Sequence, residues 1–219
     1  MKKYAIIAAG GSGQRMASTT PKQFLELNGK AILWYSVKAF IDAFDDIEII
    51  VVVSPTFIEE ARKICNGFAG VSFIEGGASR FQSVKNGLAA VQESSIVFVH
   101  DAVRCLVTKD LLHRCYEQAG TNGSAIPSIA VNDSIRIIEN GIHKVVDRNT
   151  IRIIQTPQTF RSEIILPAFK AKDNASFTDE ATVVEAAGNE VHLIEGEQTN
   201  IKITRPVDLI IAEKLMQQR

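Results

Sequence analysis

A glycine-rich stretch near the amino terminus contains residue types that bind phosphate groups. It reads Gly10-Gly11-Ser12-Gly13, and Arg15 and Lys22 follow it. Glycines let the backbone approach a ligand closely, and consecutive N–H groups in such a loop can bind phosphate oxygens. Arg15 and Lys22 add two full positive charges nearby. We therefore interpret the stretch as a phosphate-binding loop rather than as a charged surface turn.

Two common kinds of phosphate-binding loop do not fit this stretch. A Walker loop needs Gly-Lys-Ser/Thr, whereas Gly13 is followed by Gln14 and Arg15. A dinucleotide fingerprint needs a third glycine where Met16 stands, and an acid after the second strand, where Val53 leads into serine and proline. Kinase-type and nicotinamide-dehydrogenase functions are both disfavoured, and the second would require measurable NAD(P) binding.

The elements around this loop alternate between apolar strands and amphipathic helices. Buried strands are predicted at residues 4–9, 48–53, 71–74 and 96–100, and helices at 32–44, 56–66 and 79–93. This alternation predicts an α/β fold with a mostly parallel sheet and helices on both faces. A length of 219 residues suggests one domain over residues 1–219.

The pattern changes after about Gly123. Residues 134–138 and 143–146 alternate polar and apolar side chains around Asn140-Gly141, which is a strong hairpin signal. We expect a two-stranded arm within roughly residues 128–152. Because an isolated hairpin is only marginally stable, it should pack on something, such as a second subunit. A helix at 178–187, a strand at 190–194 and a closing helix at 206–217 are predicted to follow.

Composition excludes several classes of partner. The net charge of −1 argues against a basic nucleic-acid-binding surface and against attachment to anionic membranes. The longest aliphatic run, residues 49–53, is too short to span a bilayer. Cys65, Cys105 and Cys115 form no Cys-x-x-Cys pair, and the four histidines show no zinc spacing. A cytoplasmic location with reduced thiols is the expectation.

An ordered set of short motifs resembles the cytidylyltransferases that act on sugar-alcohol phosphates. The loop at residues 8–16 with Pro21-Lys22-Gln23-Phe24 resembles their amino-terminal signature. The further matching segments, in chain order, are Gly76-Gly77-x-x-Arg80-x-x-Ser83-Val84, His100-Asp101-Ala102-x-Arg104, Val146-Asp147-Arg148-Asn149, Gln155-Thr156-Pro157-Gln158, Thr178-Asp179-Glu180-Ala181 and Asn200-Ile201-Lys202-Ile203-Thr204. Together they cover residues 5–212, and the set is far more specific than any one motif.

Within these enzymes the motifs look most like the 2-C-methyl-D-erythritol 4-phosphate cytidylyltransferase family of the non-mevalonate isoprenoid pathway. The segments at 147–149, 155–158 and 178–181 favour this family over the ribitol-5-phosphate cytidylyltransferases of teichoic-acid synthesis, which share the amino-terminal loop. The resemblance implies a Rossmann-like three-layer nucleotidyltransferase fold. It also implies transfer of CMP from CTP to the acceptor phosphate, giving 4-diphosphocytidyl-2-C-methyl-D-erythritol and pyrophosphate.

The residues leave two further functions open. The chain could be a related nucleotidyltransferase that uses another sugar phosphate or base, which nucleotide competition would test. It could also be a catalytically inactive nucleotide-binding regulator. The presence of Arg15, Lys22 and Lys202 argues against the regulator, because loss of catalysis usually removes charged catalytic groups first.

The implied reaction is attack by a phosphate monoester on the α-phosphorus of CTP. Its second pKa lies near ~6, so the nucleophile is already largely ionised at neutral pH and needs no general base. Catalysis should then come from positioning and electrostatics, supplied by lysines, arginines and Mg²⁺ or another divalent cation.

By resemblance, four residues are assigned to catalysis. Arg15 and Lys22 hold the triphosphate and stabilise the pentavalent transition state. Lys202 positions the acceptor phosphate. Arg148, beyond the hairpin, reaches across a dimer interface into the partner's site, so the arm would make the protein a homodimer.

Binding roles are implied for a larger set. The nucleotide-binding residues are Ala8, Ala9, Gly10, Gly11, Gly13, Gly77, Arg80 and Ser83. The substrate-binding residues are Asp101, Ala102, Arg104, Ser134 and Thr156. Asp101 closes an apolar run at the carboxyl end of a predicted strand, where open α/β sheets bind ligands. It is therefore also the candidate ligand of Mg²⁺, directly or through water.

Three residues depart from the family pattern. Cys105 stands where proline is usual, Val103 replaces alanine, and Ser134 replaces threonine in the arm. Ser134 keeps a hydroxyl. Val103 and Cys105 are expected to reshape the wall that faces the polyol, so acceptor identity follows less directly than reaction class.

Overall fold

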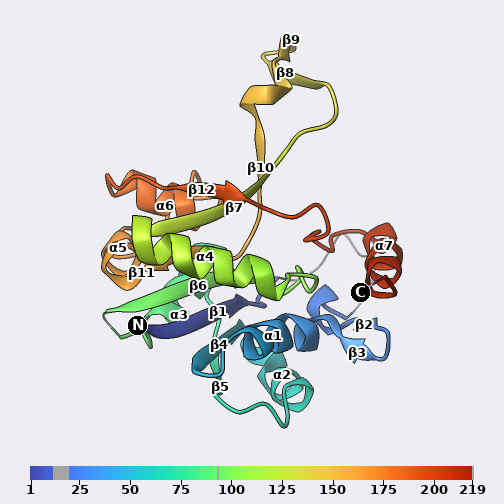
Figure 1. Cartoon of the computed structure of the whole chain (residues 1–219), viewed down its shortest axis with the longest axis vertical. Helices are drawn as coiled ribbons and strands as arrows, with labels where there is room; N and C mark the ends of the chain where they lie inside the picture. Colours follow the sequence, from blue (N-terminus) through green and yellow to red (C-terminus); the bar gives the residue numbers. More distant parts are fainter. Residues whose placement is uncertain (12–19, 93, 219) are drawn as a thin grey trace.

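A central sheet of eight strands organises the protein (Figure 1). The structure is a computed structural model that describes residues 1–11, 20–92 and 94–218. The strands of the sheet are β1 (Lys2–Ala8), β4 (Ile47–Val53), β5 (Val71–Glu75), β6 (Ser95–Asp101), β7 (Ser124–Ala130), β10 (Arg152–Ile154), β11 (Gln158–Arg161) and β12 (Leu193–Glu195). Their order is β10-β7-β11-β6-β1-β4-β5, and β12 pairs with β7.

The two halves of the sheet differ in direction. Strands β5, β4, β1 and β6 pair in parallel, whereas β11 pairs antiparallel with both β6 and β7. Strand β10 is also antiparallel to β7, while β12 is parallel to it. The predicted α/β fold with a mainly parallel sheet is confirmed. The antiparallel strands fall in the part of the chain for which the sequence pattern predicted few elements.

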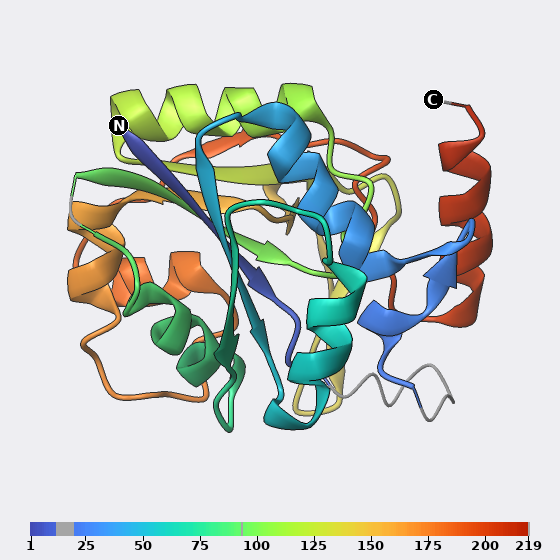
Figure 2. The ribbon, with the colours of Figure 1, turned by 90° about the horizontal axis from the view of Figure 1, so that it is seen from below.

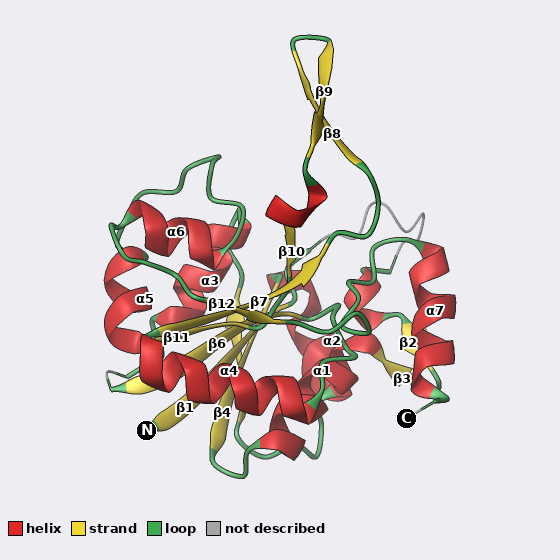
Figure 3. Cartoon of the chain, turned by 45° about the horizontal axis from the view of Figure 1, so that its top comes forward, coloured by secondary structure: helices red, strands yellow, loops and turns green. Residues whose placement is uncertain are grey.

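Helices cover both faces of the sheet (Figures 2 and 3). They are α1 (Ile32–Ala43), α2 (Ile58–Ile64), α3 (Arg80–Leu88), α4 (Lys109–Asn122), α5 (Ser162–Ala168), α6 (Glu180–Ala186) and α7 (Pro206–Met216). Successive strand residues point to opposite faces. Ala5 and Ile7 of β1 pack in the core with α1, α2 and α4, and Tyr4 and Ile6 pack in the core with α3, α5 and α6. The predicted three-layer arrangement follows from this alternation.

The ends of several elements differ from the prediction for local reasons. The helix predicted at 56–66 starts as a 3-10 turn, η3 (Pro55–Phe57), and continues as α2. Ser79 is the cap of α3 rather than its first residue, because its Oγ accepts a hydrogen bond from the Gln82 N–H at 3.0 Å. The strand predicted at 190–194 is β12, which begins where pairing with β7 begins, at Leu193.

The predicted hairpin is present as β8 (Ile135–Glu139) and β9 (Ile142–Val146), which among the described strands pair only with each other. Asn140 and Gly141 both have positive φ, at 51° and 79°, as the turn signal requires. The hairpin extends away from the main body (Figure 1). Strands β7 and β10 at its base belong to the central sheet, so residues 128–130 and 152 of the expected arm lie in that sheet. Treating residues 1–219 as one domain with this arm stays a prediction.

A small third core lies beside the sheet. It joins Leu27 of β2 (Glu26–Leu27), Ile32 of α1, Leu106, Ile203 and Ala212 of α7. Strand β2 pairs with β3 (Lys30–Ala31). None of the helices in the described part of the chain combines the length and apolar composition needed to span a bilayer.

Candidate active site

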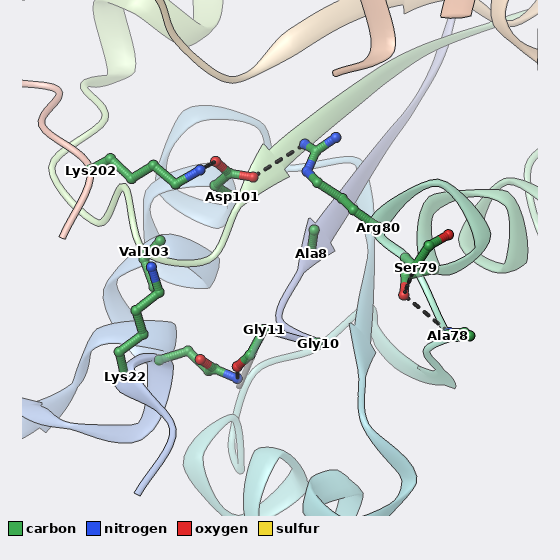
Figure 4. A pocket seen from close by; sticks show the side chains of 13 residues that line it. Ala8, Gly10, Gly11, Lys22, Ala78, Ser79, Arg80, Asp101, Val103 and Lys202 are labelled. Atoms are coloured by element: carbon green, nitrogen blue, oxygen red, sulfur yellow. Dashed lines mark hydrogen bonds and ion pairs between the residues drawn. The ribbon is translucent and has the colours of Figure 1, made fainter. Parts of the chain in front are cut away.

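A cavity of about 250 Å³ opens at the carboxyl ends of the parallel strands. Segments that follow β1, β5 and β6 meet there, which is where open α/β sheets bind ligands. The described residues that line it are Ala8, Gly10, Gly11, Lys22, Gln23, Gly77, Ala78, Ser79, Arg80, Ser83, Asp101, Val103 and Lys202 (Figure 4). Nine predicted site residues are among them, drawn from segments up to 194 positions apart in the chain (from Ala8 to Lys202).

The start of the glycine-rich loop is held by a residue to which no role was assigned from the sequence. Gln23 Nε2 donates to the carbonyls of Ala9, at 2.5 Å, and Gly11, at 3.1 Å. The neighbouring Lys22 Nζ donates to the carbonyl of Ile203 at 3.1 Å, next to Lys202. The signal for Gln23 was its place in the Pro21–Phe24 motif. Gly13 and Arg15 lie outside the described residues.

Ser83 and Gly77 form a second wall of the cavity. Ser83 Oγ accepts from the Gly77 N–H at 3.0 Å and donates to the Ser79 carbonyl at 2.8 Å. A Cβ on Gly77 would lie 2.1 Å from Cγ and 2.5 Å from Cβ of Gln82, so only glycine fits without movement. These contacts fix the loop that the sequence assigned to the nucleotide.

Charged groups converge on Asp101 at the end of β6. Lys202 Nζ lies 2.8 Å from Asp101 Oδ2, and Arg80 Nη2 lies 3.2 Å from Oδ1. Figure 4 shows the two cations approaching this carboxylate from opposite sides. Burial works against the charge of Asp101, but these cations hold its pKa below the usual range. Asp101 is therefore a carboxylate at neutral pH.

Arg80 has a second anionic partner, Glu180, to which the sequence analysis assigned no role. The guanidinium Nη1 and Nη2 contact the two carboxylate oxygens of Glu180. Burial opposes the charge of Arg80, yet Glu180 and Asp101 raise its pKa above the ordinary value. Burial raises the pKa of Glu180, and Arg80 opposes that shift. Only its occurrence in the Thr178–Ala181 motif could have pointed to Glu180.

Thr156 and His100 form a buried frame behind Asp101. The Asp101 N–H donates to Thr156 Oγ1 at 3.0 Å, so the hydroxyl proton of Thr156 is available for His100 Nδ1, 3.2 Å away. His100 Nε2 then donates to the Arg104 carbonyl at 3.2 Å. Burial lowers the pKa of His100 to about 4, which keeps the ring neutral at pH 7.

Arg104 takes part in the same frame. Its Nη1 donates to the Asn200 carbonyl at 2.8 Å and its Nη2 to the Ile154 carbonyl at 3.3 Å. Neither Arg104 nor Thr156 is among the described residues that line the cavity. Both residues contact Asn200, two positions before Lys202, because Arg104 donates to the Asn200 carbonyl and the Thr156 carbonyl accepts from Asn200 Nδ2. Their role as substrate contacts stays a prediction.

Ala9 and Ala102 contribute to the site through backbone hydrogen bonds. The Ala9 N–H donates to the Val52 carbonyl at 2.7 Å, and the Ala102 N–H donates to the Ala8 carbonyl at 3.1 Å. Both side chains are buried and lie behind the described cavity wall rather than in it.

The two predicted arm residues lie apart from the described cavity wall. Ser134 is exposed just before β8. Arg148 lies in η4 (Arg148–Thr150), where its Nη1 donates to the Asn132 carbonyl at 2.5 Å. Neither lines the cavity within the described part of this chain.

The two departures near Asp101 have different surroundings. Val103 lines the cavity, as expected of a residue in its wall. Both residues pack in the third core, but Cys105 is not among the described residues that line the cavity. A direct effect on the ligand is therefore open to Val103, whereas Cys105 acts on the packing behind it.

Comparisons with known proteins agree over nearly the whole chain. The sequence model of the family described as "IspD: 2-C-methyl-D-erythritol 4-phosphate cytidylyltransferase" matches residues 4–218. A relative of that name from Azobacteroides pseudotrichonymphae is 42% identical, with 98% of this chain and 99% of the relative covered.

Solved structures give the same result. One from Thermus thermophilus, titled 2-C-methyl-D-erythritol 4-phosphate cytidylyltransferase, is 33% identical with a TM-score of 0.79 and covers 99% of this chain and 100% of its own. A 4-diphosphocytidyl-2C-methyl-D-erythritol synthase from Anaerococcus prevotii is 26% identical with a TM-score of 0.85, covering 99% and 96%. The chain belongs to the 2-C-methyl-D-erythritol 4-phosphate cytidylyltransferase family.

Proposed function

We propose that this protein transfers CMP from CTP to 2-C-methyl-D-erythritol 4-phosphate in isoprenoid precursor biosynthesis. The products are 4-diphosphocytidyl-2-C-methyl-D-erythritol and pyrophosphate. The observation that carries the proposal is one cavity that combines a glycine-rich loop with the cations Lys22, Arg80 and Lys202, in a chain matched to this family over residues 4–218.

In the reaction, an oxygen of the acceptor phosphate attacks the α-phosphorus of CTP. The new P–O bond forms as the bond to the β-phosphate breaks, and pyrophosphate leaves with the negative charge. No proton must be removed from the nucleophile. The cavity contributes positive charge and orientation, which are the main requirements of phosphoryl transfer.

Each segment of the cavity is suited to a different part of the substrates. The loop after β1, with Lys22 and by expectation Arg15, suits the triphosphate. The Gly77 and Ser83 wall suits the base, because the hydrogen bonds among Gly77, Ser79 and Ser83 hold this part of the cavity in a fixed arrangement. Lys202, half-exposed and paired with Asp101, suits the acceptor phosphate, which would compete with Asp101 for the ammonium group.

Mg²⁺ is part of the proposal. Among the described residues, no three His, Cys, Asp or Glu side chains gather in a way that could hold a metal ion. Mg²⁺ in nucleotide sites is commonly bound through one or two carboxylates together with substrate phosphates. The ionised Asp101 beside the cavity fits that donor set. The ion would neutralise charge on the triphosphate.

We also propose a cytoplasmic homodimer that associates through the arm and has no nucleic-acid or membrane partner. The support is the apolar surface of the arm, where Ile138 is 73% exposed and Val145 is 71% exposed on the same face of the hairpin. Light scattering should give a dimer mass that falls to the monomer mass in Ile138→Asn/Val145→Asn. Ile210→Asn, at an exposed position of α7, is the control.

Ribitol 5-phosphate is the alternative acceptor, because Val103 changes the cavity wall. The deciding experiment measures pyrophosphate release from CTP and Mg²⁺ with each acceptor in parallel. Release only with methylerythritol 4-phosphate supports the proposal. Release only with ribitol 5-phosphate reassigns the acceptor and keeps the chemistry. If folded protein that binds CTP releases no pyrophosphate with either acceptor, the proposal is contradicted.

A further inference from the structure

Glu180 is a buried carboxylate that the proposed chemistry does not use directly. It is 1% exposed and does not line the cavity within the described residues. Both of its oxygens contact Arg80, which comes from a helix 100 positions earlier in the chain. A buried charge is costly unless it is paired and hydrogen-bonded, so a carboxylate at this position needs that arginine.

The pair continues into the cavity as a chain of alternating charges. Glu180 contacts Arg80, Arg80 contacts Asp101 Oδ1, and Asp101 Oδ2 contacts Lys202. Each oxygen of Asp101 is therefore held by a different cation. The orientation of that carboxylate depends on where the guanidinium of Arg80 lies.

Glu180 is itself fixed to the central sheet. It is the first residue of α6, and Asp179 caps that helix by accepting from the Thr182 N–H at 2.9 Å. Gln158 of β11 donates to Asp179 Oδ2 at 2.9 Å and accepts from the Ala181 N–H at 2.8 Å. The first turn of α6 is thus hydrogen-bonded to a strand on both sides of Glu180.

We propose that Glu180 is a positioning residue that orients Asp101, and through it Lys202, by holding the guanidinium of Arg80 from behind. The inference rests on the proposed cytidylyl transfer. Under this inference, Arg80 anchors Asp101 and does not recognise the nucleotide base. Glu180 acts on the acceptor side of the reaction without touching a substrate.

A positioning role for Glu180 predicts different changes in kcat and CTP affinity from those predicted by two simpler roles. If Glu180 only tuned the net charge, its neutralisation would leave the cavity more positive, and both CTP binding and turnover would improve. If it only stabilised α6, its loss would lower the melting temperature, CTP affinity and turnover together. A positioning role lowers kcat while CTP affinity is kept or improved.

The test compares Glu180→Gln with Glu185→Gln, the same change at an exposed position of the same helix. We expect Glu180→Gln to lower kcat by about 10–100-fold, because a small displacement of a reacting group has effects of that size. Its Kd for CTP, measured by calorimetry, should be unchanged or smaller. Glu180→Asp keeps the charge but is one methylene shorter, so it should lose kcat as well. Glu185→Gln should match the unchanged protein.

A double variant separates positioning from folding. Arg80→Gln alone leaves the buried Glu180 carboxylate without its guanidinium partner. Arg80→Gln/Glu180→Gln removes both charges and keeps similar side-chain volumes. If Glu180 acts through Arg80, adding Glu180→Gln to Arg80→Gln should cause no further fall in kcat. An equal fall in both backgrounds would overturn the inference.

Two further outcomes overturn it in different ways. If the unchanged protein transfers CMP and Glu180→Gln keeps kcat within about twofold of Glu185→Gln, far below the positioning effect, only this inference fails. If the unchanged protein releases no pyrophosphate from CTP with either acceptor, the proposed function fails and this inference fails with it.

Discussion

At the residue scale, the cavity depends on charged side chains whose partners are far away in the chain. Asp101 is paired with Arg80 and with Lys202, which follow β5 and β12 respectively. A side chain's place at the end of a predicted strand can be inferred from one segment. Its charge partners cannot, because they come from segments that only the folded sheet brings together.

Lys22 gives the most direct test at this scale. We expect Lys22→Ala to lower kcat by about 10²–10³-fold, since the proposed function places this cavity cation next to the leaving pyrophosphate. The free energy of unfolding should change by less than about 2 kcal/mol, because a hydrogen bond such as that from Lys22 to the Ile203 carbonyl contributes modestly to stability. Steady-state kinetics and urea unfolding check the two parts.

The matched control is Lys30→Ala, because Lys30 is exposed on β3 and lies over the ring of Trp34 rather than in the cavity wall. It should keep full turnover. Normal turnover by Lys22→Ala would show that the loop assignment is wrong.

Two buried thiols allow a test of pH dependence. Burial raises the pKa of Cys65 and of Cys115 to about 12, and the thiolate is the reactive form. A raised pKa keeps both groups neutral as pH rises through 9. At pH 8 we therefore expect alkylation by iodoacetamide to be at least ~1000-fold slower than at an exposed cysteine of ordinary pKa.

Mass spectrometry after timed labelling measures that rate at each cysteine. The same protein in urea should label fully and serves as the control. Rapid labelling of either thiol in the native protein would contradict its placement in the core.

At the element scale, the cavity exists because parallel strands end at one edge of the sheet. The segments after β1, β5 and β6 each add a short part of its wall. Their convergence was predictable from strand–helix alternation, whereas the loop conformation was not. The loop after β5 is closed by contacts among Gly77, Ser79 and Ser83 within a single turn of chain.

Gly77→Ala tests that loop. The added methyl group would overlap Gln82, so the loop must shift and the Gly77 N–H must move away from Ser83. We expect the Kd for CTP to rise by about tenfold, equivalent to the loss of roughly one hydrogen bond's contribution. Calorimetry with CTP and Mg²⁺ measures this.

Gly120→Ala is the comparison, because a Cβ there meets nothing within 4 Å and the residue lies inside α4. It should leave CTP affinity unchanged and stabilise the protein by up to about 1 kcal/mol. An unchanged Kd in Gly77→Ala would remove this loop from the nucleotide site.

At the scale of the whole molecule, the arm is the feature that a single chain does not explain. Within the part of the chain that the structure describes, strands β8 and β9 pair only with each other, and they carry exposed isoleucine and valine side chains. Arg148, which the resemblance assigns to catalysis, lies beside this hairpin rather than in the described cavity wall. The proposed homodimer, in which a second copy completes the site, would account for both facts.

Mixing two inactive variants tests a shared site. Arg148→Ala and Lys202→Ala should each be inactive in acceptor use, whereas subunit exchange creates hybrids in which one site is intact. Equal mixing should restore activity to about a quarter of the unchanged protein, because half the dimers are hybrids with one good site of two. Coupled pyrophosphate release measures the recovery. No recovery, with hybrids detected by native mass spectrometry, would place Arg148 outside the partner's site.

Through the resemblance of its motifs to a known family the sequence implied the reaction class, and from local patterns it indicated a phosphate-binding loop, the α/β architecture and the hairpin. These local features could be predicted because glycine loops, strand periodicity and Asn-Gly turns are each contained within one short segment of the sequence. The sequence also identified nine residues of the cavity wall in the described part of the chain, since each follows a strand or belongs to a motif.

The contacts that hold those residues in place became visible with the folded structure. Gln23 on the backbone of the glycine loop and Glu180 behind Arg80 became recognisable through contacts with distant segments. The antiparallel strand β11 likewise inserts between β6 and β7, a choice of neighbours that no local pattern encodes. The geometry of the whole sheet determines which charged side chains come into contact. The ion pairs of buried charges can therefore be identified only in the folded chain.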